Sequence, residues 1–382
     1  DLTRCALPNP GEEFMKKRFL GVLLSVAMVA AVLAGCGSSG AKETAAPAGS
    51  ETEAASEAAS GETEAAGNTG DVITVGFSQV GAESDWRTAN SESMKSTFST
   101  ENGYNLIFDD AQQKQENQIA AIRNFIQQEV DYIVLAPVTE SGWDTVLQEA
   151  KDAEIPVIIV DRMVNVSDDS LYTAWVGSNF KLEGQKACEW LKQYAAAKNM
   201  SEVNIVDIQG TIGASAQIGR TEALNEAVEA NGWNLLAQQT GEFTQAKGQE
   251  VMESMLKQYD NINVVYCEND NEAFGAIEAI KAAGKTVGPD GDILVMSFDT
   301  TKQGITDTLS GDIIVNTECN PLHGPRVEQI IKQLQAGETP EKQAYVEEGI
   351  YAHGSDVASV SIDGTDYEVT EVTQDVVDAR AY

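Results

Sequence analysis

Charged, amide and aromatic side chains stand directly after several apolar segments of the sequence. Asp161 and Arg162 follow the apolar segment 156–160, and Asn269 and Asp299 each follow a later one. Carboxylate, amide and guanidinium groups form paired hydrogen bonds with adjacent hydroxyl groups, and Trp or Phe rings cover the C–H face of a sugar ring. These residue types at these positions therefore suit the binding of a sugar.

The same residues have simpler interpretations. Asp161 and Arg162 could form a surface ion pair of little energetic value, and Arg220 could lie on a solvated helix face. Trp86 and Phe243 could be ordinary core aromatic residues. The position of Asp161 and Arg162 favours a binding site, because ligands of open parallel sheets bind beyond the carboxyl ends of the strands.

Short apolar segments alternate with amphipathic ones along residues 71–382. This alternation is typical of parallel sheets with helices on both faces. Its repetition in two halves of similar length predicts an α/β fold with two doubly wound parallel-sheet lobes. The expected strands are 72–78, 105–109, 132–136, 156–161, 203–208, 235–239, 263–267 and 292–298, and the expected helices are 85–102, 117–129, 142–153, 215–230, 245–259 and 271–283.

The N-terminal segment has the pattern of a secretory signal over 15–35. A basic start after Met15 leads into an apolar run over 19–33, which ends in Leu-Ala-Gly-Cys36. The run is short for a membrane span and its flanks suit a cleaved signal. The ending resembles the bacterial lipobox, which implies lipidation of Cys36; a plain cleaved signal with a chance cysteine is the alternative. Residues 1–14 are interpreted as lying outside the fold.

The segment 36–70 is interpreted as the lipidated cysteine followed by a disordered acidic tether. Residues 37–70 contain six Glu, one Lys and almost nothing apolar beyond Ala. Such a composition cannot bury enough surface to offset the loss of chain entropy. We therefore expect an extracytoplasmic protein that is anchored to the cell membrane by its lipid.

The composition and motifs exclude several classes of protein. The net charge of −35 disfavours nucleic acid, which attracts basic surfaces. Cys188, Cys267 and Cys319 are odd in number and widely spaced, and His323 and His353 have no ligand spacing, so we expect neither a disulfide framework nor a metal site. The folded part has no nucleophile elbow, phosphate loop or dinucleotide fingerprint, which argues against an enzyme.

Several longer stretches carry a family resemblance. They are Val75-Gly-Phe-Ser-Gln-Val-Gly, Glu83-Ser-Asp-Trp-Arg, Gln112-Gln-Lys-Gln-Glu-Asn-Gln, Ala136-Pro-Val, Glu149-Ala-Lys-Asp-Ala-Glu-Ile-Pro, Asp161-Arg, Gln209-Gly-Thr-Ile-Gly-Ala-Ser and Lys247-Gly-Gln-Glu-Val-Met-Glu-Ser. Together they resemble the pentose/hexose-binding family of ABC-importer binding proteins, over nearly all of 72 to about 337. Ribose-binding members have Phe-Phe in place of Trp86-Arg87 and Asn in place of Ala136, which favours the galactofuranose-binding members. The resemblance ends near Ala352.

The resemblance implies two lobes joined by a three-stranded hinge, 71–175 with about 320–345 and 176–319 with about 346–382. It implies that a galactofuranose- or galactose-type monosaccharide is held in the cleft and delivered to the membrane subunits of an ABC permease, without a cofactor. We expect a monomer. The ligand-binding residues that the resemblance implies are Ser78, Trp86, Arg87, Asp161, Arg162, Arg220, Phe243, Asn269, Asp299, Glu318 and Asn320.

Three other classes share parts of this pattern. A sensor lipoprotein that presents a sugar or autoinducer to a chemoreceptor or kinase would use the same cleft. A repressor with this core would need an N-terminal helix-turn-helix, where this chain has a lipobox-like segment. A secreted hydrolase could use Asp161 and Asp299 as its carboxylate pair, although hydrogen bonding to a ligand is the better-motivated role for both.

Overall fold

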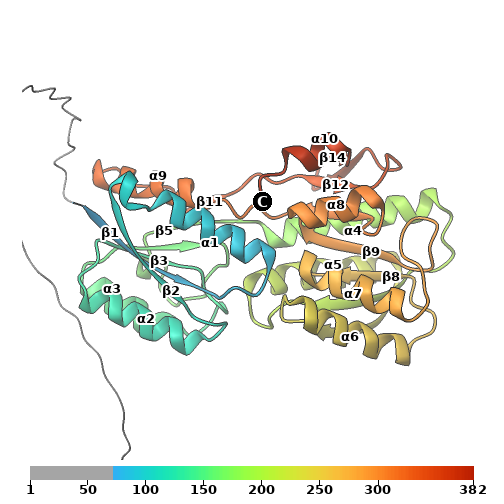
Figure 1. Cartoon of the computed structure of the whole chain (residues 1–382), viewed down its shortest axis with the longest axis horizontal. Coiled ribbons are helices and arrows are strands. Elements are labelled where there is room, and N and C mark those ends of the chain that lie inside the picture. The colour runs from blue at the N-terminus through green and yellow to red at the C-terminus, as the bar shows by residue number, and fades with distance from the viewer. Residues whose placement is uncertain (1–71) are drawn as a thin grey trace, which may run out of the picture. The chain divides into compact units, whose positions relative to one another are not determined.

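Two separate sheets organise residues 72–382, the part of the chain that the computed structural model describes (Figure 1). These residues lie within one structural unit, Asn68–Tyr382. The expectations for the signal segment, Cys36 and the tether concern residues before 72 and lie outside the described residues. Over 72–382, no helix combines the length and the apolar character needed to cross a bilayer.

The first sheet has six strands, all parallel, in the order β11-β5-β4-β3-β1-β2. Helices α1 and α9 pack on one face of the sheet, and α2 and α3 pack on the other (Figure 1). Both faces are therefore covered, and the inner strands are continuous apolar runs. The elements are β1 (Ile73–Gln79), α1 (Asp85–Thr97), β2 (Tyr104–Asp110), α2 (Gln115–Gln127), β3 (Tyr132–Leu135), α3 (Asp144–Asp152), β4 (Val157–Val160), β5 (Ala174–Gly177), α9 (Gly324–Gln335) and β11 (Gln343–Tyr345).

The second sheet has eight strands in the order β13-β14-β12-β10-β9-β8-β6-β7. Its five strands from β10 to β7 are parallel, whereas β12 is antiparallel to β10 and β13 is antiparallel to β14. The elements are α4 (Phe180–Ala197), β6 (Asn204–Gln209), α5 (Ser215–Asn231), β7 (Asn234–Thr240), α6 (Gln245–Gln258), β8 (Val264–Cys267), α7 (Asp270–Ala282), β9 (Leu294–Asp299), α8 (Lys302–Ser310), β10 (Val315–Glu318), β12 (Ile350–Ala352), β13 (Ser359–Ile362), β14 (Thr365–Glu371) and α10 (Gln374–Ala379).

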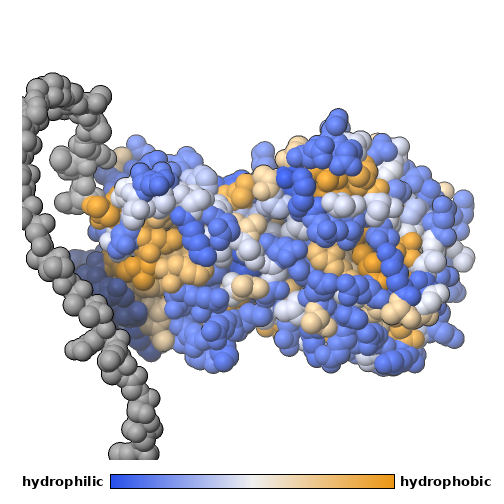
Figure 2. Space-filling view, viewed as in Figure 1, coloured by the Kyte–Doolittle hydropathy of each residue, from blue (hydrophilic) through white to orange (hydrophobic). Residues whose placement is uncertain are grey.

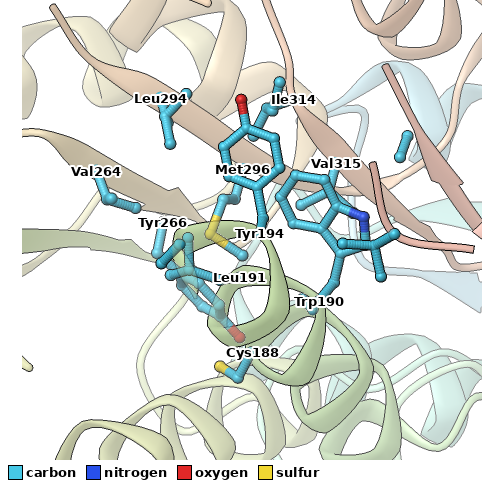
Figure 3. Close-up of a cluster of buried hydrophobic side chains, with 14 of the residues drawn as sticks. Cys188, Trp190, Leu191, Tyr194, Val264, Tyr266, Leu294, Met296, Ile314 and Val315 are labelled. Atoms are coloured by element: carbon cyan, nitrogen blue, oxygen red, sulfur yellow. The ribbon is translucent and has the colours of Figure 1, made fainter. Parts of the chain in front are cut away.

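The largest hydrophobic core lies between α4 and the second sheet (Figure 3). Trp190 and Tyr194, one helical turn apart on α4, stack with their ring centroids 4.7 Å apart. Tyr266 of β8 and Met296 of β9 face the same cluster and are fully buried. Buried aromatic residues of this size contribute much of the free energy of folding. Helices α6 and α7 cover the opposite face of the sheet with a second core.

The chain crosses between the two sheets three times, after β5, after β10 and after β11. With two doubly wound α/β lobes, these crossings confirm the predicted fold class. The C-terminus ends beside the second crossing (Figure 1). There Glu318 Oε1 accepts hydrogen bonds from Arg380 Nη1 at 2.9 Å and from Tyr382 Oη at 2.7 Å. The end of the chain thus holds the last residue of β10, a contact that the sequence did not predict.

Several helices begin directly beyond a strand because a polar residue caps them. Ser84, Asn269 and Thr301 each accept a hydrogen bond from a backbone N–H of the first turn, in α1, α7 and α8. Such caps satisfy N–H groups that have no partner inside the helix. They fix the point at which the chain turns from sheet to helix, which is the edge of the sheet where a ligand is expected.

Two features of the sequence prediction need correction. The helix expected over 85–102 ends at Thr97, and the remainder forms a short 3-10 turn at Thr100–Asn102, which Gly103 closes with a φ of +86°. The list of expected elements also omitted β5, α4 and all elements after β9. Strand β5 is only four residues long, and strands as short as this carry little periodicity.

Gly275 lets α7 approach α6 closely, and we expect its replacement by Ala to destabilise the protein. A Cβ at this position would lie 2.2 Å from Gln245 O and 2.6 Å from Gln249 N, both backbone atoms of α6. We expect the free energy of unfolding to fall by about 1–3 kcal/mol through overpacking, although Ala alone favours a helix by about 1 kcal/mol over Gly. Urea unfolding measures this change. Glu278→Ala, on the exposed face of α7, is the control and should change it by less than about 0.5 kcal/mol; a stable Gly275→Ala variant would contradict the close packing.

Candidate functional site

A small cavity lies between the two sheets and is lined from both of them. The space between its lining atoms is about 290 Å³, a volume that includes space open to solvent. The lining is polar and aromatic, and it includes six ionisable residues apart from Cys319. The lining residues are Glu83, Ser84, Trp86, Arg87, Asp161, Arg162, Phe180, Ala216, Arg220, Phe243, Asn269, Asp299 and Cys319.

On the first lobe, two arginines and two carboxylates form one buried network. Arg87 Nε lies 2.9 Å from Glu83 Oε1, and Arg87 Nη2 lies 2.8 Å from Asp161 Oδ2. Arg162 Nη2 lies 3.6 Å from the same Glu83 oxygen. All four side chains are at most 4% exposed, so the charges are held in a dry setting in which each needs its partner.

Burial and neighbouring charges act differently on the two arginines. Burial tends to lower the pKa of Arg87, but the charges of Asp161 and Glu83 outweigh it and raise the pKa. Burial together with the charge of Arg87 lowers the pKa of Arg162 to about 10. Both guanidinium groups remain protonated near neutral pH and can donate to a ligand.

On the second lobe, Arg220 of α5 is the centre of a similar network. Its Nε and Nη2 lie 2.9 and 2.8 Å from Glu183 Oε2, and Nη1 donates to the backbone oxygen of Glu268. Its Nη2 also lies 3.6 Å from Asp299 Oδ1. Burial raises the pKa of Asp299 well above its ordinary value, although the charge of Arg220 opposes the shift. Arg220 can therefore present donors to the cavity while its own charge is balanced.

Three aromatic rings complete the walls. Trp86 Nε1 donates to Cys319 O at 2.7 Å, which fixes the indole against the second crossing. The guanidinium of Arg162 lies 5.0 Å from the centroid of Phe243. A Cβ at Gly210 would lie 1.9 Å from Phe243 Cζ, so only glycine allows the ring its place. Phe180 contributes the third ring.

An uncommon backbone conformation directs several of these side chains into the cavity. Asp161, Phe243 and Asp299 have φ values of 62°, 61° and 105°, in a region that non-glycine residues seldom occupy. Strain of this kind costs about 1–3 kcal/mol per residue and concentrates at binding sites. All three lie where a strand has just ended or ends, so the strained positions turn their side chains at the edge of the sheet.

The two lobes also touch each other directly around the cavity. Asp85 N donates to Asn271 Oδ1 at 2.9 Å, and Met163 N donates to Ser215 Oγ at 2.8 Å. A backbone hydrogen bond of 2.9 Å joins Glu140 N to Gly213 O. The lobes are therefore closed upon the cavity, and a ligand must enter when they separate.

The structure brings together eight of the eleven residues that the sequence analysis selected. Ser78, Glu318 and Asn320 do not line the cavity. Ser78 lies inside β1 and is fully buried. Glu318 faces the C-terminus, and Asn320 N donates to Glu348 Oε1. Cys319, which lies between Glu318 and Asn320 in the sequence, lines the cavity in their place.

The sequence analysis missed five lining residues. They are Glu83, Ser84, Phe180, Ala216 and Cys319. The spacing of Glu83 and Arg87, four residues apart at the start of a helix, is a signal that could have found the first of them. Phe180 begins α4, and nothing in its local sequence distinguishes it from a core residue.

A cleft closed by two similar lobes, with paired charges facing inward, defines a receptor for a small solute. The chain belongs to the periplasmic binding protein family, since the family described as "Periplasmic binding protein domain" matches residues 75–317. It is a solute-binding protein and not an enzyme.

Three relatives are similar over most of their length. The galactofuranose-binding protein YtfQ of Escherichia coli is 42% identical over 284 residues, which cover 73% of this chain and 87% of that protein. A Mycobacterium smegmatis structure in complex with β-D-fucofuranose is 43% identical, with a TM-score of 0.70 and coverage of 73% and 91%. The arabinose ABC transporter binding protein of Shewanella sp. ANA-3, bound to L-arabinofuranose, is 42% identical, with a TM-score of 0.69 and coverage of 73% and 92%.

Proposed function

We propose that this protein binds a neutral aldose in its furanose form, of the galactofuranose type, in the interlobe cavity. The observation that carries the proposal is the set of paired charges around a small cavity that both lobes line. The relatives support it, because the ligands named for three of them are furanose sugars.

The charges of the cavity favour an uncharged ligand. Each of the three guanidinium groups has a carboxylate within 3.6 Å, so none is free to neutralise an anion. Buried groups held in this way still have spare donors and acceptors, and a sugar hydroxyl can use both. Glu83 Oε2, buried and without a hydrogen-bond donor over residues 72–382, is one such acceptor.

Each remaining side chain has a role in this proposal. Trp86 and Phe243 cover the apolar faces of the ring. Asp161 of lobe 1 and Asp299 of lobe 2 accept hydrogen bonds from the sugar hydroxyl groups, and Asn269 can both donate and accept hydrogen bonds. A ligand that fills these positions satisfies polar groups that would otherwise be costly to bury.

Sugar binding closes the lobes by population shift. The ligand stabilises the closed state because only that state places lobe 1 (71–175 and about 320–345) and lobe 2 (176–319 and about 346–382) against it together. The closed protein then delivers the sugar to an ABC importer, the kind of system named for the Shewanella relative. The signal pattern over 15–35 and the lipobox-like ending at Cys36 support a location for this step at the outer face of the cell membrane, with the protein held by its lipid.

Ring-locked sugars test the proposal directly. 1,4-Anhydro-D-galactitol is fixed as a five-membered ring and 1,5-anhydro-D-galactitol as a six-membered ring. We expect D-galactose, L-arabinose and the five-membered analogue to raise the melting temperature, since a ligand of the folded state stabilises it by mass action. We expect no shift with the six-membered analogue or with D-galacturonate.

The other outcomes separate the parts of the proposal. A shift with the six-membered analogue alone would refute the furanose form. A shift with galacturonate would refute the argument from paired charges. If amino acids shift the melting temperature and no sugar does, the ligand class is wrong although the cleft remains a binding site.

A further inference from the structure

The three crossings between the lobes converge on a buried polar cluster directly behind Arg220. Ser178 comes from the first crossing, Cys319 from the second and Glu348 from the third, and Glu183 of α4 lies among them. A carboxylate oxygen of Glu183, one of Glu348 and the Cys319 sulfur all lie within 4.8 Å of one another. None of these residues was selected from the sequence.

One carboxylate oxygen in the cluster stands out. Glu183 is 1% exposed, and its Oε2 accepts from Arg220. Its Oε1 has no hydrogen-bond donor within residues 72–382, although it is buried. On the other side, Glu348 Oε1 accepts from Ser178 Oγ and from Asn320 N, each at 2.7 Å. A proton between the two carboxyl groups would satisfy the open oxygen of Glu183.

Counting the surrounding charges gives the same answer. Glu183, Glu348 and Asp299 are acidic, and Arg220 and Lys186 are the basic groups that face them. Glu318 lies nearby but has Arg380 as its own partner at 2.9 Å. The groups facing the pair are Arg220 from α5, Lys186 from α4, Asp299 from β9, Glu318 from β10, and Cys319 from the second crossing. Three acids against two bases leave one negative charge, which one bound proton would remove.

We propose that Glu183 and Glu348 share one proton in the closed protein, so that sugar binding at Arg220 is accompanied by proton uptake at the hinge. Glu348 then acts as a positioning residue, because it holds Glu183, and Glu183 holds the arginine that faces the ligand. The inference rests on the proposed function, since it concerns the same cavity.

The pKa shifts agree with this geometry and set the sign of the effect. Burial raises the pKa of Glu183 and that of Glu348, whose shift the neighbouring Glu183 charge increases. Opening of the lobes admits water and returns the pair toward the ordinary value near 4.5. The closed state therefore holds a proton that the open state releases. The affinity for the sugar is therefore highest at a pH below the open-state pKa. It falls as the pH rises from there to the raised pKa of the closed state, and it is constant at a pH above the raised pKa.

A metal ion is the competing occupant of the cluster. Glu183, Cys319 and Glu348 could offer oxygen and sulfur ligands to zinc. Burial raises the pKa of the Cys319 thiol well above its ordinary value, and Arg220 and Lys186 already supply positive charge. Both facts favour a proton over a divalent cation.

Calorimetry in buffers with different ionisation enthalpies tests the proposal. With D-galactose as the probe, we expect uptake of up to one proton per sugar between pH 4.5 and the raised pKa of the closed state, and an association constant that falls by up to tenfold per pH unit within that range. Glu348→Gln should still bind the sugar, without proton uptake and with a flat pH profile. Glu347→Gln, an exposed neighbour on the same crossing, should behave as the unmodified protein.

Each other result has a definite meaning. Sugar binding without proton exchange at any pH would overturn the linkage and leave the proposed function intact. No binding at any pH would overturn both. If zinc raises the melting temperature and Glu348→Gln abolishes that rise, the cluster is a metal site. The two-buffer measurement on the unmodified protein decides the matter even if the variant fails to fold.

Discussion

Asp161→Asn should weaken sugar binding by about 30-fold to 1,000-fold while the protein stays folded. Asp161 Oδ2 lies 2.8 Å from Arg87 Nη2 and 3.9 Å from Arg162 Nε, and its side chain is 4% exposed. The amide keeps the shape and accepts the φ of 62°, since Asn tolerates this region. It removes the charge that orients both guanidinium groups. Loss of one partner in a buried charge pair at a binding site costs about 2–4 kcal/mol.

Titration calorimetry with D-galactose measures this loss, and the chain offers a matched control. Asp363 has a φ of 50° in the exposed turn between β13 and β14, so Asp363→Asn makes the same chemical change in a similar backbone setting. It should leave the affinity unchanged. Undiminished binding by Asp161→Asn would show that the ligand does not depend on this network.

The alternation of strands and helices was predictable because it is a local property. The strand expected over 156–161 is β4 (Val157–Val160), which is buried throughout, and the helix expected over 117–129 overlaps α2 (Gln115–Gln127). A buried strand or an amphipathic helix has its pattern within a few residues. The alternation then indicated parallel sheets covered on both faces.

The C-terminal part was not predictable because its partners are distant in sequence. Strand β12 joins β10, and Arg380 and Tyr382 bind Glu318 more than sixty residues earlier. Nothing in the sequence near Arg380 indicates that it pairs with a carboxylate in the hinge. The pairing becomes visible only when the second sheet is complete.

The cavity was partly predictable for a physical reason that also explains the failures. Residues that follow a parallel strand converge at one edge of the sheet, which selected Asp161, Asn269 and Asp299 correctly as lining residues. The same rule selected Ser78, but β1 continues through Gln79, so Ser78 remains inside the sheet. Phe180 belongs to a helix rather than to the end of a strand, so the rule does not select it.

Hydrophilic residues cover most of the face shown in Figure 2, whereas the charges that matter for binding are hidden. The net charge of −35 belongs to the surface as a whole. Within the cavity, acids and arginines are paired one to one or nearly so. The composition therefore argued against nucleic acid as a partner, but it could not indicate the ligand, because the ligand contacts only the cavity, where the charges are paired.

Arg220→Met should lower the free energy of unfolding by about 3–5 kcal/mol, because it leaves Glu183 buried without its partner. Arg220 and Glu183 are each 2% exposed in their side chains, so water cannot replace the lost contact. The double variant Arg220→Met/Glu183→Gln should recover much of the loss, since an amide has no charge to bury. Lys181→Met, which breaks exposed ion pairs with Glu222 and Glu226, should cost less than about 1 kcal/mol.

The pH dependence of this loss identifies the unpaired carboxylate as its cause. Without Arg220, burial raises the pKa of Glu183 further, and a group with a raised folded-state pKa loses its stabilising proton as the pH rises through that value. Denaturant unfolding of Arg220→Met at pH 5 should therefore show a smaller loss than at pH 8. In the double variant Arg220→Met/Glu183→Gln, the loss in the free energy of unfolding should be the same at pH 5 and at pH 8. A loss of the same size at both pH values in the single variant would mean that missing packing, rather than a stranded charge, destabilises the protein, since packing of the arginine on Phe180 and Phe298 does not titrate.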